Sequence, residues 1–132
     1  MAERYFLRET KDGELIIKEE LLTTRAEKIA DDFIGDVRRP NVKSSQLRKF
    51  YNEVKALAKR AEEEKFEKIK PLVKMLKVKV NYQKGRGFVP EVFVRFISDC
   101  VDNIEDRSDF DAFVKHFEAV IGFYYGKAQR FD

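Results

Sequence analysis

Apolar residues recur at helical spacing along most of this chain, and the pattern predicts five helices. The first is expected from about residue 14 to residue 34, where the apolar positions are Leu22, Ala26, Ile29, Ala30 and Phe33. Residues 1–13 end in a Lys-Asp-Gly turn signal, which fits either a short hairpin or an extended arm. Residues 35–45 collect Gly, Pro, Asn and Ser and are predicted to form a loop.

Two long helices are predicted in the middle of the chain. Ser44 or Ser45 can cap the first of them, whose apolar face consists of Leu47, Phe50, Tyr51, Val54, Leu57, Ala58 and Ala61. The second covers residues 65–84 and contains "LKVKVNY", which alternates like a half-buried strand when it is taken alone. Together with the residues before it, this stretch follows helical spacing instead, through Ile69, Leu72, Val73, Leu76 and Val80. We therefore interpret it as the last turns of a helix.

Glycine, proline and serine mark the boundaries of the last two helices. Gly85 is expected to be the left-handed cap of the preceding helix, with Arg86 held just beyond it. Pro90 suits the first position of the fourth helix, and Ser108 can cap the fifth together with Asp111. The fourth helix has a wide apolar face, formed by Val89, Val92, Phe93, Phe96, Ile97, Cys100, Val101 and Ile104.

The fifth helix carries more aromatic residues than one buried face can hold. Phe117 and Tyr124 share a face, whereas Phe123 and Tyr125 point away from it at about 100° per residue. We therefore predict self-association, or docking on a neighbouring subunit, through these four residues. The alternative is that the first helix covers the second face.

Composition limits the class of protein. A chain of 132 residues and 15.6 kDa fits one domain spanning residues 1–132. Hydrophobic residues make up 43% and charged residues 39%, so we expect an ordered all-α protein, a compact bundle of about five helices. No apolar run approaches the roughly 20 residues of a membrane span, and the first residues lack the apolar core of a secretion signal. We therefore expect a cytoplasmic protein with no membrane partner.

Positive charge is concentrated in one segment. Residues 43–86 hold 14 Lys or Arg against 5 Glu, a net charge of +9. Residues 1–42 and 87–132 carry −2 and −4, so the overall charge is only +3. A strongly basic segment in a nearly balanced protein is typical of one that binds a polyanion, and nucleic acid is the first candidate.

Two helices of this segment each present a stripe of basic residues that includes one amide. The first stripe is Arg48, Asn52, Lys55 and Lys59, and the second is Lys70, Lys74, Lys77, Asn81 and Lys84. If both stripes face the same side of the protein, they form a continuous phosphate-binding surface. The alternative is that each stripe is an ordinary solvated helix face.

The sequence contains no pattern typical of catalysis or cofactor binding. His116, the single histidine, has no neighbouring histidine or cysteine, which favours a structural role over acid–base work. Cys100, the single cysteine, is expected to be a small core residue. The stretch "KGRG" lacks the glycine spacing and the Lys-Ser/Thr ending of a P-loop. We expect no catalytic residue, no metal and no cofactor.

Three segments, "SSQLRKFYNEV", "LKVKVNYQKGR" and "FDAFVKHFEAVIGFYYGKA", follow one another in an order and spacing that resembles the small subunit of the type III-A CRISPR interference (Csm) complex. The resemblance covers residues 44 to about 127, and its central motif matches at Leu76, Lys77, Lys79, Tyr82, Gly85 and Arg86. It implies an all-helical, non-catalytic protein that is present in more than one copy beside the backbone subunits. Such subunits line the groove where guide RNA and target RNA pair.

The favoured hypothesis is an RNA-binding structural subunit of that complex. Its expected partners are guide RNA, target RNA, the backbone and large subunits, and further copies of itself. Candidate phosphate contacts are Arg48, Lys49, Lys55, Lys59, Lys74, Lys77, Lys79, Lys84 and Arg86, of which Lys49 and Lys79 rest on the resemblance alone. The alternative is a helical adaptor that docks on an acidic protein. A third hypothesis is a small nuclease that uses His116 with a carboxylate.

Overall fold

A computed structural model describes residues 4–128. Over these residues the chain forms five α-helices, one 3-10 helix and two short antiparallel hairpins. The α-helices are α1 (Thr24–Ile34), α2 (Ser44–Glu63), α3 (Phe66–Gly85), α4 (Glu91–Asp102) and α5 (Arg107–Ala128). The expected all-α bundle is confirmed, with two small sheets added to it.

The N-terminal segment is a hairpin, so the helix expected from residue 14 is wrong over its first half. β1 (Leu7–Glu9) pairs with β2 (Leu15–Ile17), and the turn between them contains Gly13 at a φ of 83°. The 3-10 helix η1 (Glu19–Leu22) follows, and α1 starts only at Thr24. Two adjacent isoleucines in β2 favour an extended backbone, and the pairing with β1 outweighs the helical composition around them.

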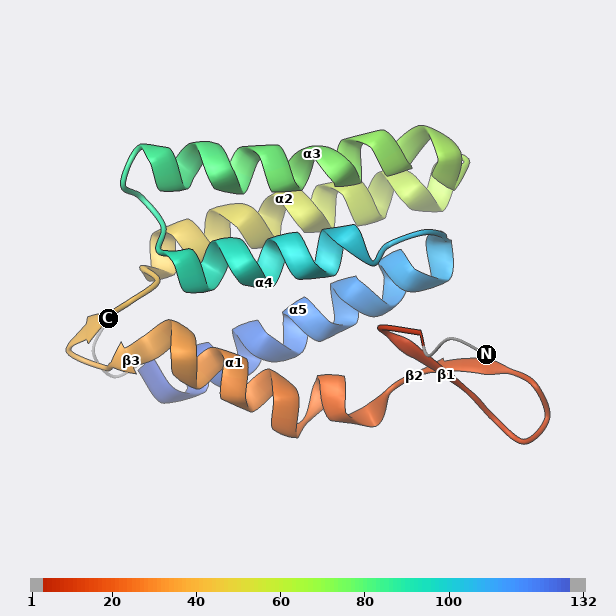
Figure 1. The fold of residues 1–132 in the computed structure, drawn as a ribbon, viewed down its shortest axis with the longest axis horizontal. Helices are drawn as coiled ribbons and strands as arrows, with labels where there is room; N and C mark the ends of the chain where they lie inside the picture. Colours follow the sequence, from red (N-terminus) through yellow and green to blue (C-terminus); the bar gives the residue numbers. More distant parts are fainter. Residues whose placement is uncertain (1–3, 129–132) are drawn as a thin grey trace.

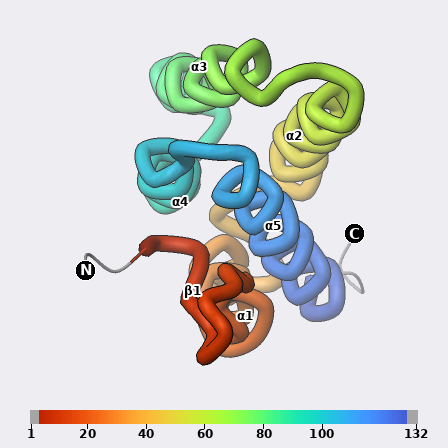
Figure 2. Tube along the Cα trace, turned by 90° about the vertical axis from the view of Figure 1, so that its right-hand side faces the viewer, coloured from red at the N-terminus to blue at the C-terminus, as the bar shows by residue number. Residues whose placement is uncertain are grey.

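The helices form two packed pairs that α2 joins. α1 packs against α5 and α3 packs against α4, while α2 contacts both α3 and α5. In Figure 1, α3 and α2 lie at the top of the molecule and α1 lies near the bottom. Figure 2 shows α3 at the top, α4 and α2 on opposite sides below it, and α1 in the lower part beside α5. The basic segment therefore occupies one side of the molecule, away from the hairpin.

The core is built around aromatic rings from four helices. Phe33 of α1 meets Phe93 of α4 edge to face, with 5.4 Å between ring centroids, and Phe96 meets Phe117 of α5 at 5.5 Å. Phe50 of α2 packs against the same Phe93 at 5.3 Å. Edge-to-face pairs add stabilisation beyond the apolar area that they bury. This ring cluster fixes α2 relative to α4 and α5, and so fixes the position of its basic face.

Contacts within the molecule cover much of the aromatic surplus of α5. Phe117 and Tyr124 have no exposed surface, and Phe123 and Tyr125 are half-buried. The Tyr124 hydroxyl donates to the Val42 carbonyl oxygen at 2.6 Å. α1 packs against α5, while Tyr125 lies against Arg48 of α2.

β3 (Gly35–Asp36) and β4 (Arg39–Pro40) form a tight turn inside the predicted loop. α2 then starts at Ser44 with Lys43 at its N-cap, and no side chain caps it. The prediction of a serine cap was therefore wrong. Ser44 and Ser45 instead lie inside the first turn.

Three other predicted boundaries differ in the structure, one of them because an aspartate replaces a serine as the cap and one because a second glycine replaces the first. The Asp106 carboxylate accepts from the Asp109 backbone N–H at 3.0 Å, so Asp106 caps α5, which starts at Arg107, just before the expected serine cap at Ser108. The left-handed residue after α3 is Gly87, with a φ of 79°, whereas Gly85 is still helical. Pro90 is the N-cap of α4 rather than its first residue.

Candidate nucleic-acid interface

The basic residues of α2 are exposed and face solvent. Arg48, Lys49, Lys55 and Lys59 have no carboxylate partner within residues 4–128. The Arg48 guanidinium lies 5.3 Å from the ring centroid of Tyr125, and the Lys55 ammonium lies 5.9 Å from that of Tyr51. Contact with a ring face orients a cation and leaves its charge uncompensated. This helix therefore presents four positive charges that can meet an anion.

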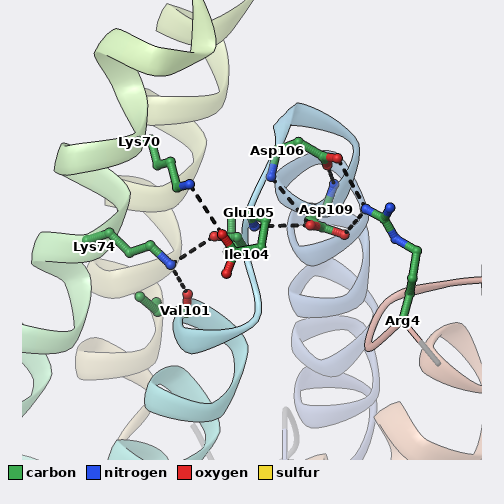
Figure 3. A network of polar contacts seen from close by, with 8 residues as sticks. All are labelled: Arg4, Lys70, Lys74, Val101, Ile104, Glu105, Asp106 and Asp109. Atoms are coloured by element: carbon green, nitrogen blue, oxygen red, sulfur yellow. Dashed lines mark hydrogen bonds and ion pairs between the residues drawn. The ribbon is translucent and has the colours of Figure 1, made fainter. Parts of the chain in front are cut away.

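The basic stripe of α3 lies along α4 instead. Figure 3 shows Lys70 and Lys74 reaching from α3 toward the end of α4. The Lys74 ammonium donates to the carbonyl oxygens of Val101 and Ile104, both at 2.8 Å. Val101 belongs to the last turn of α4, where carbonyls lack i+4 partners within the helix, and Ile104 lies just beyond the end of that helix. Half-buried Lys74 is thus an internal cap for α4.

Three further lysines of α3 have carboxylate partners. Lys77 pairs with Asp102 at 2.9 Å, Lys84 pairs with Glu91, and Lys79 reaches across to Glu53 of α2. The Lys84 ammonium lowers the pKa of the Glu91 carboxyl below its usual range. These pairs are partly exposed, and exposed pairs contribute about 0–1 kcal/mol. A phosphate can therefore compete for these lysines more readily than for Lys74.

The lysines of α3 adjoin a second polar network at the corner between α4 and α5. Figure 3 shows Asp109 beside Asp106, with the guanidinium of Arg4 against both. Asp109 is 3% exposed and accepts from the backbone N–H of Glu105 at 3.0 Å. Lys70 meets the Glu105 side chain at 3.4 Å. The corner therefore ties α3, α5 and the N-terminal segment together, and it has a structural role.

Arg86 is positioned by the end of α3. The Phe88 N–H donates to the Gln83 carbonyl oxygen and the Gly87 N–H donates to that of Lys84, both at 2.9 Å. These two bonds, with Gly87 left-handed, form a Schellman motif. The Arg86 guanidinium lies 5.8 Å from the Tyr82 ring centroid and 4.9 Å from that of Phe88. The prediction that a helix cap positions Arg86 was sound, although Gly87 and not Gly85 is the capping glycine.

Sequence reasoning missed the apolar side chains on the outer face of α3. Leu72 is exposed, contrary to its predicted place on the buried face, and so are Met75, Val78 and Tyr82. A groove of about 420 Å³ lies between α2 and α3, with Lys49, Val78, Lys79 and Tyr82 among its lining residues. The sequence contained this signal, because these residues recur at helical spacing on a face centred roughly 140° from the one that Val73, Leu76 and Val80 form, and those three are buried.

The four residues predicted to form an interface between molecules contact the rest of this chain. Phe117 and Tyr124 are buried, so a partner protein does not reach them in this structure. Tyr125 packs against Arg48 and donates its hydroxyl to the Ser44 carbonyl oxygen at 3.3 Å. Only Phe123 and Tyr125 keep some exposed surface.

His116 and Cys100 are core residues. The His116 Nδ1–H donates to the Leu21 carbonyl oxygen, and the ring lies 5.6 Å from that of Phe96. Burial lowers the pKa of His116 and raises the pKa of the Cys100 thiol. Within residues 4–128 no group of three His, Cys, Asp or Glu side chains is placed to hold a metal ion. None of the helices described is long and apolar enough to cross a membrane.

Comparison with known proteins gives one family. The model of the family described as Csm2 Type III-A matches residues 17–128. This span starts in β2 and includes all five α-helices, so it extends the resemblance from residue 44 back through α1. No curated protein and no solved structure gives a significant match.

Proposed function

Because the chain belongs to the Csm2 family of the type III-A CRISPR complex, we propose that it is a non-catalytic subunit that contacts RNA phosphates along the guide–target groove. Membership of this family makes the other subunits of the complex its partners. The proposal places it in the cytoplasm, in more than one copy, with sequence choice left to base pairing between the RNA strands.

The observation that carries the RNA-binding role is the unpaired charge of α2. Proteins that bind nucleic acid without reading bases need cations that are free to displace the counterions of the phosphates. The exposed cations without a carboxylate partner within residues 4–128 in this part of the molecule include Arg48, Lys49, Lys55, Lys59 and Arg86.

These five residues are the proposed primary phosphate contacts. Lys77, Lys79 and Lys84 are secondary contacts, because a phosphate must first displace a carboxylate from each of them. The proposed set leaves out Lys74, whose ammonium already holds two carbonyl oxygens.

Binding of labelled single-stranded RNA at several salt concentrations tests the proposal. With four to six phosphates engaged, the slope of log affinity against log salt is expected to be roughly −3 to −5. The affinity should vary little with base sequence, and the RNA should remain intact. A flat salt response, or preference for one sequence, contradicts the phosphate contacts.

The same assay separates the rival functions. RNA that is cut would identify a nuclease. Binding of an acidic helical peptide, with no binding of RNA, would identify a protein adaptor.

A further inference from the structure

We propose that Tyr82, Arg86 and Phe88, here called the aromatic platform, stack an unpaired RNA base. This inference rests on the proposed RNA-binding function and deepens it, since it adds a contact to a base at a defined point of the phosphate surface. The platform lies at the C-terminal end of α3, beside the groove between α3 and α2.

The first argument is that the two rings are held in place while they remain open to solvent. Tyr82 is 60% exposed and Phe88 is 44% exposed. The Schellman bonds from Gly87 and Phe88 fix the turn that brings Phe88 back beside the helix. A rigid aromatic surface loses little conformational entropy when a flat ligand stacks on it.

The second argument is the arginine between the rings. The Arg86 guanidinium lies over one face of the Tyr82 ring and one face of the Phe88 ring. It has no carboxylate partner within residues 4–128. A guanidinium can stack on a base and can also bind a phosphate with two N–H groups. The platform therefore combines stacking surfaces with an uncompensated positive charge.

The third argument is the neighbouring groove. Val78 and Tyr82 line its α3 side, and Lys49 lines it from α2. A nucleotide stacked on Tyr82 thus has a free cation close by for its phosphate. This combination of ring faces and cations is the usual means by which proteins hold single-stranded nucleic acid.

The net charge of the surface favours RNA, and not a second copy of this chain, as the ligand of the aromatic platform. Two copies meeting through this face would bring together two segments of net charge +9. The repulsion between them opposes a dimer, whereas the same charge attracts a polyanion. An acidic peptide with apolar side chains would also complement this basic, aromatic surface, and the experiments below distinguish it from RNA.

The first experiment measures the affinity of the full chain for two RNAs of equal length. One is a single-stranded oligonucleotide, and the other has the same phosphates with several abasic positions. Tyr82→Leu should weaken binding of the first RNA by roughly tenfold, because one stacking contact is lost. It should leave binding of the abasic RNA unchanged. Leu72→Ala, at an exposed apolar position near the other end of α3, is the matched control and should change neither affinity.

The second experiment uses the absence of tryptophan from the sequence. Tyr82→Trp places a single fluorescent reporter in the platform, and stacking of a base should quench it. Leu15→Trp, in the hairpin, provides an exposed reporter far from the basic segment and should keep its emission. Abasic RNA should quench neither.

The outcomes separate the two proposals. If RNA binds with the expected salt dependence while neither Tyr82→Leu nor abasic positions change its affinity, the result contradicts the aromatic platform and leaves the proposed phosphate contacts in place. If RNA does not bind the unmodified chain at low salt, both proposals fail. If an acidic peptide quenches the Tyr82→Trp reporter and RNA does not, the surface docks a protein and the platform is overturned.

Discussion

α2 and α3 carry the same pattern of basic residues and use it differently. In each helix the stripe directly follows the buried positions, as Lys55 follows Val54 and Lys74 follows Val73. Beside α3 lies the end of α4, which offers the Asp102 carboxylate and the carbonyl oxygens of Val101 and Ile104. Beside α2 lies the end of α5, which offers the ring of Tyr125 to Arg48. Whether a charge stabilises the fold or remains free for a ligand is therefore decided by the neighbouring helix.

The largest expected effect is on stability. Lys74→Met should lower the free energy of unfolding by about 2 kcal/mol, because two helix-end carbonyls lose a charged donor. Lys59→Met on α2, the matched control, should change it by less than about 0.5 kcal/mol. Urea denaturation followed by circular dichroism measures both. Equal stabilities for the two variants would contradict the distinction between the helices.

The second effect is on RNA affinity. Lys55→Gln combined with Lys59→Gln should weaken binding roughly tenfold and make the salt slope shallower by about 2, since two phosphate contacts are lost. The corresponding pair on α3, Lys70→Gln with Lys77→Gln, should have a clearly smaller effect, because both lysines already have carboxylate partners. A larger loss for the α3 pair would reverse the assignment.

A smaller effect tests whether the carboxylate partners of the α3 lysines reduce the affinity of the protein for RNA. Asp102→Asn frees Lys77 and should raise RNA affinity about two- to threefold, because an anion 2.9 Å from its ammonium is neutralised. Asp12→Asn removes the same charge from the distant hairpin turn and serves as the control. If both variants gain equally, the gain comes from net charge and not from Lys77.

The smallest expected change concerns the pair between Lys84 and Glu91. Lys84 lowers the pKa of Glu91, so this pair stabilises the folded protein above the usual pKa of a carboxyl group and is lost as the pH falls through the lowered value. Lys84→Gln should bring the pKa of Glu91 back toward its ordinary value, while Lys59→Gln leaves it lowered. NMR titration of the side-chain carboxyl measures the difference.

The buried faces of the helices could be predicted from the sequence because helical periodicity reports burial directly. Periodicity does not report which helix lies alongside, so Lys74 and Lys55 look alike in the sequence although one caps α4. The α3 cap shows a second limit, since Gly85 and Gly87 are both suitable and only the backbone selects between them. At the start of α5, Ser108 matches the capping-box pattern in the sequence, whereas the carboxylate of Asp106 is the stronger acceptor and forms the cap.

The pairing of the first and last helices affects how the protein is made. Tyr124 bonds to Val42 across 82 residues of sequence, and Lys127 bonds to Asp31 across 96. During synthesis α1 leaves the ribosome first, yet most of its contacts with other α-helices are made with α5, which follows last. α2, α3 and α4 can meet earlier through contacts of shorter range. A stalled or shortened chain that ends before α5 therefore exposes the apolar surfaces of α1 and α2, and we expect it to aggregate.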